Sequence, residues 1–329
     1  MKIKVLITGG SGFIGTNLLQ YYIERNIDVL NIDIKEPRNP IHITYWKKTD
    51  ILNKLALTKI FQTYKPTHVV HLAAKTDLRG KNLDDYKTNT IGVKNILKVM
   101  KTVPSLRKVI FASSMLVCKS GYIPKNSNDY NPNTTYGRSK VEAEHIIKNE
   151  FPREYKWNIV RPTSIWGPWF SEPYKNFFCT ILKNKFYHPG KKAATKTYGF
   201  VLNTVYQINY LLFSENENIN KKMYYIGDKP PINISEWANE IRFYLNRKPA
   251  KELPYSIFII LAKTGDILSK FSIKFPMTSF RLKNMTTNNI VDLDELYATV
   301  GTPPYNREEG IKITLEWLLK NEKNETKCL

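Results

Sequence analysis

The sequence predicts an α/β protein in which a doubly wound parallel sheet is joined to a smaller, mixed α/β domain. From residue 2 to about 165, short apolar runs alternate with amphipathic helical patterns, as in parallel strands connected by helices. A glycine-rich turn follows the first apolar run, and after residue 165 the pattern becomes irregular and rich in proline and aromatic side chains. The 329 residues, 42% of them hydrophobic, suffice for one large domain or two closely joined ones.

The first strand, turn and helix are predicted to form a phosphate site. Residues 3–7 are an apolar run, residues 8–15 read TGGSGFIG, and an amphipathic segment follows. Gly9 permits a tight turn, Gly12 lets a diphosphate approach the backbone, and Gly15 lets the helix pack closely on the strand. The N–H groups at the start of the helix would then bind the diphosphate of a dinucleotide.

The second predicted strand, residues 27–34, helps to identify that dinucleotide. Asp33 stands near its end, 18 residues after Gly15, close to the spacing of about 20 that is typical of a ribose-binding carboxylate. A carboxylate there binds free ribose hydroxyls and repels a 2′-phosphate, so the sequence favours NAD over NADP. Lys35 and Arg38 follow closely and could hold a 2′-phosphate, which keeps NADP as the alternative.

A serine, a tyrosine and a lysine could supply the chemistry. The predicted strand at 107–113 leads into Ser114, at the carboxyl edge of the sheet where ligands of open α/β sheets bind. Tyr136 and Lys140 are four residues apart in a predicted helix, so they share one face. A phenol with a pKa of about 10 is a poor base at neutral pH. A neighbouring ammonium and a cationic nicotinamide would both favour the phenolate.

The domains are expected to interleave along the chain. Further apolar runs at 68–72 and 157–161 predict strands of the same sheet. The nucleotide-binding domain is therefore expected at residues 1–165, with parts of 198–227 returning to it. The remainder of residues 166–329 would form the substrate domain, and the aromatic segment that follows residue 165 suits a substrate lid or the floor of a pocket.

On these motifs the chain resembles the NAD-dependent nucleotide-sugar epimerase/dehydratase family of extended short-chain dehydrogenases/reductases, whose nucleotide-binding half is a Rossmann fold. The C-terminal half resembles the family more loosely. The specific matches are TGGSGFIG at 8–15, TDIL at 49–52, HLAA at 71–74, NTIGVKNIL at 89–97, FASS at 111–114, YGRSK at 136–140 and RPTSIWGP at 161–168.

The resemblance implies roles for individual residues, and the three widely spaced cysteines predict that there is no metal site. Ser114, Tyr136 and Lys140 would be the catalytic triad. The residues implied to bind NAD are Gly9, Gly12, Phe13, Ile14, Gly15, Asp33, Lys35, Asp50, Ile51, Leu72, Ala73 and Ala74, together with Tyr136 and Lys140. The candidate contacts of the nucleotide sugar are Ser114, Tyr136, Ser164, Lys196 and Arg281.

Some positions depart from the family pattern, so the identity of the substrate does not transfer. Ser164, Lys196 and Asn203 stand where relatives usually carry Asn, Arg and Asp. Arg281 and Lys283 could bind the diphosphate or form a solvated basic loop.

The residues after Ser114 narrow the reaction. The 4,6-dehydratases of the family carry acidic residues there, and 3,5-epimerase/reductases carry a cysteine, whereas this chain has Met115 and Leu116, which cannot move protons. Of the reactions known in the family, the sequence therefore favours hydride transfer at a single sugar carbon, C4. Return of the hydride to the other face of the ketone would make a 4-epimerase. Release of the keto sugar would make a 4-dehydrogenase of, for example, a GDP- or UDP-linked hexose or heptose in surface polysaccharide synthesis. A non-catalytic NAD-binding module and a dehydrogenase of a non-sugar alcohol are weaker alternatives.

Charge and cysteine content bear on partners and location. The net charge of +21 is spread along the chain, which fits a basic cleft for a diphosphate and does not favour nucleic acid. Three widely spaced cysteines and a first strand that starts almost at residue 1 favour the cytoplasm, with no signal peptide. The longest apolar run, 256–262, is too short to span a bilayer, so no membrane insertion is expected. We expect this run to form a buried helix. The alternatives are that it faces a membrane surface or a partner.

The resemblance also implies a homodimer. Relatives pair through two helices of each subunit, which correspond here to about 85–101 and 136–149. The candidate interface residues are Ile91, Val99, Val141 and Ile146, with inward packing against the sheet as the alternative for each of them.

Overall fold

The computed structural model describes residues 2–152, 154–171, 173–271, 273 and 275–321, which fall into two compact units. The first unit comprises Met1–Ile165, Gly199–Gly227 and Asp292–Tyr305. The second comprises Trp166–Tyr198, Asp228–Val291 and Asn306–Leu329. The chain passes between the units five times, and the first two crossings fall within the short strands β7 (Ser164–Trp166) and β10 (Tyr198–Phe200).

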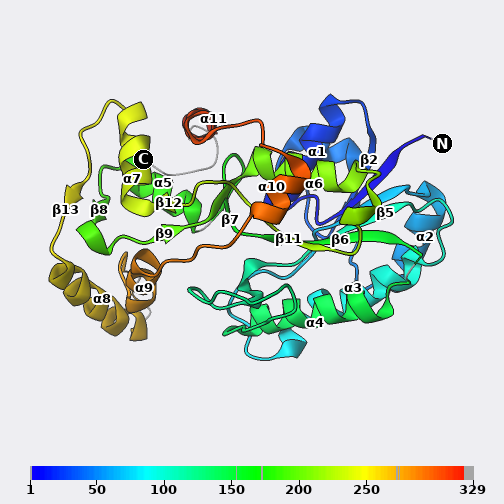
Figure 1. The fold of residues 1–329 in the computed structure, drawn as a ribbon, viewed down its shortest axis with the longest axis horizontal. Helices are drawn as coiled ribbons and strands as arrows, with labels where there is room; N and C mark the ends of the chain where they lie inside the picture. The colour runs from blue at the N-terminus through cyan, green and yellow to red at the C-terminus, as the bar shows by residue number, and fades with distance from the viewer. Residues whose placement is uncertain (1, 153, 172, 272, 274, 322–329) are drawn as a thin grey trace. The chain divides into compact units, whose positions relative to one another are not determined.

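The first unit is built on a seven-stranded parallel sheet, which confirms the predicted doubly wound α/β fold (Figure 1). Its strand order is β11-β6-β5-β4-β1-β2-β3. The strands are β1 (Lys4–Thr8), β2 (Asp28–Asp33), β3 (Trp46–Lys48), β4 (His68–His71), β5 (Lys108–Ala112), β6 (Lys156–Pro162) and β11 (Met223–Ile226). Since β1 pairs with both β2 and β4, Thr8 lies opposite Ile32 on one side and His71 on the other. The carboxyl ends of these three strands therefore meet at one edge of the sheet.

Helices cover both faces of this sheet (Figure 1). One layer contains α1 (Phe13–Glu24), α6 (Val201–Phe213) and α10 (Asp294–Val300), with α1 packed on α6 and α10 on α6. The other contains α2 (Lys54–Tyr64), α3 (Lys87–Met100) and α4 (Thr135–Glu150), in which α3 packs against both of its neighbours. The largest described core lies between this second layer and the sheet, where Val69 and Val109 of the strands are buried with Ile96 of α3.

Two of the four candidate dimer residues belong to that core, so for these two the alternative of inward packing against the sheet holds. Val99 and Ile146 are buried within their own unit because both side chains face the sheet. Ile91 of α3 is exposed and Val141 of α4 is half-buried.

The second unit has a core of aromatic side chains. Trp237 is fully buried, with ring centroids 5.1 Å from Trp166, 4.9 Å from Phe177 and 4.7 Å from Tyr198. The aromatic segment that follows residue 165 thus contributes Trp166 and Phe170 to the interior of this unit. Its helices are α5 (Tyr174–Leu182), α7 (Ile234–Tyr244), α8 (Tyr255–Lys270), α9 (Ser279–Thr286) and α11 (Arg307–Asn321).

Short strands and 3-10 turns complete the fold. In the second unit, β9 (Thr195–Lys196) pairs with β12 (Ile232–Asn233), and β8 (Tyr187–His188) pairs with β13 (Lys251–Glu252). The 3-10 turns are η1 (Pro40–Tyr45), η2 (Leu83–Tyr86), η3 (Met115–Val117), η4 (Gly190–Lys192) and η5 (Glu217–Ile219).

Candidate active site

The glycine turn after β1 is held close to the neighbouring strands. Gly9 has φ +75°, and its N–H donates to the carbonyl of Ile32 at 2.9 Å. A Cβ on Gly9 would lie 2.6 Å from the backbone N of Ala73, and one on Gly15 would lie 2.5 Å from the carbonyl O of Gly9. The turn therefore has room only for glycine at these two places. Gly12 is the N-cap of α1, and no side chain among the described residues caps this helix end, which leaves the positive end of α1 facing the turn.

We expect Gly9→Ala to destabilise the first unit by about 2–6 kcal/mol and to abolish measurable NAD binding. The added methyl group would strain the left-handed backbone at this position and clash with the backbone of the HLAA segment. Gly301→Ala is the matched control. Its φ is +73° and an added Cβ would meet nothing within 4 Å, so it should cost only the backbone strain of about 1–3 kcal/mol and keep NAD affinity. Denaturant titration and calorimetric NAD binding measure both effects. Equal NAD affinity in the two variants would contradict the close fit around Gly9.

A buried threonine fixes the segment opposite the turn. Thr8 Oγ1 forms a 2.7 Å hydrogen bond with His71 Nδ1 and accepts the N–H of Ala73 at 3.2 Å. Burial lowers the pKa of His71 to about 3, with a further contribution from Lys140, so this imidazole is neutral at physiological pH. The contacts hold Leu72, Ala73 and Ala74 at the carboxyl edge of the sheet, beside the glycine turn.

Asp33 lies at the end of β2, against the glycine turn. Its carboxylate accepts the N–H of Ser11 at 3.1 Å and that of Lys35 at 2.9 Å. Burial raises the pKa of Asp33, and the two N–H donors oppose that rise. The Arg38 guanidinium donates to the carbonyl of Ser11 at 3.2 Å, so both acidic and basic side chains border this end of the turn.

The turn after β3 is tied to α3 by an asparagine. Asn95 donates to the carbonyls of Ile51 and Leu52, each at 3.1 Å. A Cβ on Gly92 would lie 2.6 Å from Cδ1 of Ile51, so the glycine of NTIGVKNIL makes space for this side chain. Asp50 accepts the N–H of Leu52 at 2.8 Å, and its turn follows β3 at the same edge of the sheet.

Ser114 and Tyr136 meet although they are distant in sequence. Ser114 follows β5 and caps η3, its Oγ accepting the N–H of Leu116 at 3.1 Å. Tyr136 lies in the first turn of α4, and its hydroxyl hydrogen-bonds to Ser114. Burial raises the pKa of Tyr136 to about 12, although the bond to Ser114 favours the phenolate. The phenol is thus protonated at neutral pH in the chain by itself.

Lys140 lies one helical turn after Tyr136 and is buried. Its ammonium donates to the carbonyl of Ala112 at 2.8 Å, and burial lowers its pKa to about 8, an effect that Glu144 opposes. Asn89 of α3 steadies the same turn of α4, because it donates to Ser139 Oγ at 2.9 Å, and Ser139 donates to the carbonyl of Tyr136 at 2.7 Å.

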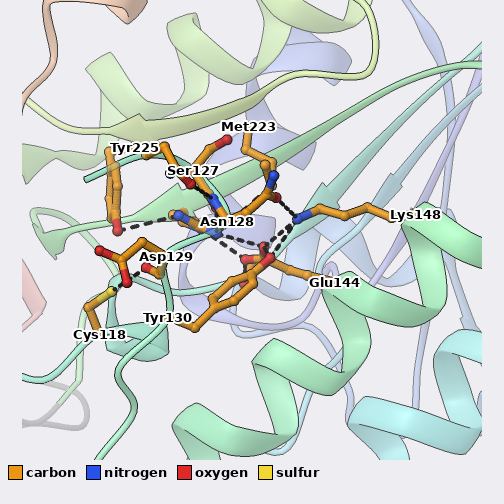
Figure 2. A network of polar contacts seen from close by, with 12 residues as sticks. Cys118, Ser127, Asn128, Asp129, Tyr130, Glu144, Lys148, Met223 and Tyr225 are labelled. Carbon is orange, nitrogen blue, oxygen red and sulfur yellow. Dashed lines mark hydrogen bonds and ion pairs between the residues drawn. The ribbon is translucent and has the colours of Figure 1, made fainter. Parts of the chain in front are cut away.

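A buried ion pair anchors α4 to the sheet. Glu144 of α4 and Arg161 of β6 are joined by two hydrogen bonds of 2.9 and 2.7 Å, and their side chains are 0% and 1% exposed. Glu144 also accepts Ser113 Oγ at 2.5 Å and the Tyr130 hydroxyl at 2.8 Å. Figure 2 shows Glu144, Lys148 and Tyr130 converging on this network. Burial would raise the pKa of Glu144, but Arg161, Ser113 and Tyr130 outweigh it and hold the pKa below its ordinary value.

The aromatic rings around Arg161 complete the network. The guanidinium carbon lies 5.2 Å from the ring centroid of Tyr130 and 5.3 Å from that of Tyr225. The carbonyl of Ser127 accepts Arg161 Nη2 at 2.7 Å. This network joins β5, α4, β6 and the 118–131 loop, so it fixes the direction in which α4 presents Tyr136 and Lys140.

Of the remaining candidate substrate contacts, Ser164 belongs to the first unit, and Lys196 and Arg281 belong to the second. Ser164 is buried in β7 with its Oγ 4.0 Å from the sulfur of Met115. Lys196 belongs to the second unit, where its ammonium donates to Asn284 at 3.3 Å and burial lowers its pKa to about 8. Arg281 is exposed in α9 and donates to the carbonyl of Pro276 at 2.6 Å.

Known proteins resemble this chain over most of its length. The model of the NAD dependent epimerase/dehydratase family matches residues 5–208. The N-acetyl-alpha-D-glucosaminyl-diphospho-ditrans,octacis-undecaprenol 4-epimerase of Escherichia coli O157:H7 is 28% identical over 323 residues, 96% of each chain. The GDP-6-deoxy-D-talose 4-dehydrogenase of Aggregatibacter actinomycetemcomitans is 30% identical over 170 residues, 50% of this chain and 54% of the relative.

A solved structure shares the fold. The UDP-glucuronic acid 4-epimerase of Bacillus cereus, determined in complex with NAD, superposes with a TM-score of 0.72 at 20% sequence identity. The match covers 97% of this chain and 99% of that one.

Proposed function

Since this chain belongs to the NAD-dependent epimerase/dehydratase family, we propose that it is a sugar 4-epimerase that acts on a diphosphate-linked sugar. The carrying observation is the cluster at the carboxyl edge of the sheet, where Tyr136 hydrogen-bonds to Ser114 and Lys140 lies one helical turn away. No acid or base follows the serine, because Met115 and Leu116 occupy those places. The cluster is thus equipped to move one proton to and from one hydroxyl.

The nucleotide-binding half fits NAD. The glycine turn is a cradle that a Cβ would fill at Gly9 and Gly15, and it stands before the uncapped start of α1, where the diphosphate would lie. Asp33 presents its carboxylate beside that turn, where it would accept hydroxyls of the adenosine ribose. Leu72, Ala73 and Ala74 would flank the nicotinamide side, and Asp50 and Ile51 the adenine.

The chain's own residues carry the proton steps. NAD, when bound, supplies a reversible hydride acceptor for C4 of the sugar. Tyr136 as the phenolate takes the proton of the C4 hydroxyl and later returns it, while Ser114 hydrogen-bonds to the same oxygen. Lys140 provides positive charge beside the tyrosine and would bind the nicotinamide ribose. Since burial raises the pKa of Tyr136 to about 12 in the chain alone, the phenolate depends on the positive charge brought by NAD as well as on Lys140.

Two carriers of the sugar are candidates. A nucleoside diphosphate suits the family and the basic chain, with Ser164, Lys196 and Arg281 as proposed contacts. A polyprenyl diphosphate is the second, favoured because the Escherichia coli relative that matches 96% of this chain acts on a sugar carried in that way. Either carrier suits the synthesis of a surface glycan, which we propose as the enzyme's role, together with a cytoplasmic location.

A 4-dehydrogenase is the second candidate function, favoured by the half-length match to the GDP-6-deoxy-D-talose enzyme. Product analysis separates the two. We expect the NAD-loaded protein, offered UDP-, GDP- and dTDP-sugars and a polyprenyl diphosphate sugar, to yield a C4-inverted sugar with little net NADH. Stoichiometric NADH with a 4-keto product would favour the dehydrogenase. A 4-keto-6-deoxy product formed from a sugar that carries a C6 hydroxyl would refute both, since no residue after Ser114 could expel that hydroxyl.

We also propose a homodimer formed through α3 and α4. Ile91 is exposed and Val141 is half-buried on these two helices, which pack side by side. Such a dimer would steady the helix that carries Tyr136 and Lys140. Light scattering at micromolar concentration tests it, and a monomer would reject this arrangement.

A further inference from the structure

Helix α8 of the second unit, together with the residue that caps its C-terminus, carries a row of exposed apolar side chains. Ile260 and Ile267 of the helix are 64% and 57% exposed, and the cap residue Phe271 is 72% exposed. Their spacing of seven and four residues puts them on one face of the helix. Ile257 extends the row by one turn toward the start of α8. We call these four residues the apolar row.

The opposite side of α8 is already packed. Phe258 and Ala262 are buried in a cluster with Leu282 of α9. The helix is therefore apolar on two sides. The second unit itself covers one of them, and the apolar row on the other side is exposed. The prediction that residues 256–262 form a buried helix was wrong for this reason. Exposed apolar side chains continue beyond the helix at Ile273 and Phe280.

Basic residues border the apolar row. Lys263 and Lys270 each follow an isoleucine of the row by three residues, which places both lysines along one side of it. The described residues of 253–290 include four basic residues and one acidic residue, Asp266, which gives a net charge of 4 − 1 = +3. The four are Lys263, Lys270, Arg281 and Lys283.

We propose that α8 docks on the surface of a bilayer that contains anionic phospholipids, with its axis in the plane of the headgroups. An apolar face bordered by lysines is the pattern of an interfacial helix. The helix has 16 residues, and no helix in the described part of the chain is long and apolar enough to cross a membrane, so this contact is peripheral. A second copy of the chain fits the same face less well, since two surfaces of charge +3 would repel each other.

The proposal also selects between the two sugar carriers, and this part rests on the proposed function. A sugar on a polyprenyl diphosphate is confined to a membrane surface, whereas a nucleotide sugar is free in solution. An epimerase of the first kind gains from binding that surface. Docking on anionic lipid therefore favours the polyprenyl diphosphate carrier.

Vesicle co-sedimentation of the full NAD-loaded chain tests the docking without any assay of turnover. We expect binding to vesicles of phosphatidylglycerol and phosphatidylcholine to exceed binding to phosphatidylcholine alone by at least about tenfold, and to weaken as salt is added. Ile260→Gln with Ile267→Gln should weaken binding to the anionic vesicles by about tenfold or more. Lys263→Gln with Lys270→Gln should weaken it by about 25-fold, at roughly fivefold for each lysine.

Leu55→Gln is the matched control, because Leu55 is 82% exposed on α2 of the other unit and should leave binding unchanged. Circular dichroism and NAD affinity verify that each variant is folded. Equal binding to both kinds of vesicle, or unaltered binding by the isoleucine variant, would overturn the docking. So would a dimer that the isoleucine variant converts to a monomer, since the row would then lie between copies. A protein that binds vesicles but epimerises no sugar would refute the proposed function and keep the docking.

Discussion

Replacement of Tyr136 by phenylalanine should lower turnover at C4 by about 10²- to 10⁴-fold and leave NAD affinity nearly unchanged, because the change removes one proton-transfer group and little packing. Tyr136 is buried, its hydroxyl contacts Ser114, and Lys140 lies four residues along the same helix. Steady-state turnover and calorimetric NAD binding on the same preparation separate the two effects. Turnover equal to that of the unmutated chain would remove Tyr136 from the mechanism.

Tyr86→Phe provides the matched control for that loss. Tyr86 is fully buried with its ring centroid 6.0 Å from that of Tyr136, but its hydroxyl donates to the carbonyl of Asp77 at 2.7 Å. Loss of the Tyr86 hydroxyl should lower the free energy of unfolding by about 1 kcal/mol. The variant should keep most of the turnover of the unmutated chain. If Tyr86→Phe lowered turnover as much as Tyr136→Phe does, disturbed packing near the site, and not lost proton transfer, would explain both losses of turnover.

The second large effect is expected at the buried ion pair. Arg161→Met should destabilise the first unit by about 3–5 kcal/mol, because the buried Glu144 would lose its bidentate partner and keep only the ion pair with Lys148, whose ammonium is 3.8 Å away. Denaturant titration measures the loss. The double variant with Glu144→Leu should recover much of it, since no uncompensated charge would then remain.

The control for Arg161→Met is a second bidentate pair with similar geometry. Arg307 donates to both carboxylate oxygens of Glu240 at 2.6 and 2.5 Å, but these side chains are 35% and 33% exposed. Arg307→Met should therefore cost less than about 1 kcal/mol. If Arg161→Met and Arg307→Met lowered the free energy of unfolding equally, burial of the ion pair would not explain its contribution to stability.

The pair also predicts a dependence on pH. The folded pKa of Glu144 lies below its ordinary value, so its contribution to stability is present above the unfolded pKa of about 4.3 and is lost as the pH falls through the folded value. The unmutated chain should therefore lose stability below about pH 4 more steeply than the double variant. Identical acid profiles in denaturant titrations would contradict this linkage.

Sequence alone predicted the features that depend on local pattern. The glycine turn, α4 and the strands β1, β2, β4, β5 and β6 have signals within a few residues, so their places followed from spacing and apolar periodicity. The short edge strand β3 was not predicted, and β11 was expected only as a segment that returns to this domain. The contact between Ser114 and Tyr136 was also expected, because the carboxyl ends of parallel strands share one edge of the sheet.

The supports of the site depend on partners distant in sequence and were not predicted. Asn89 bonds to Ser139, 50 residues away, and Thr8 bonds to His71, 63 residues away. Glu144 stands four residues after Lys140 in the same helix, and this spacing could have indicated that it is buried on the same face. Its partner Arg161 lies on a strand, so local spacing could not identify the ion pair. The exposed side of α8 was missed because periodicity shows that a helix is apolar without showing which side is covered.

Isotope tracing at C4 tests the central claim most directly. A sugar substrate with deuterium at C4 should give the C4-inverted product with the deuterium still at C4, because the same hydride leaves and returns while Tyr136 exchanges only the hydroxyl proton. The retained label should not fall when unlabelled NADH is present in solution. Loss of deuterium from C4 to the medium, or its appearance in released nicotinamide, would contradict the account.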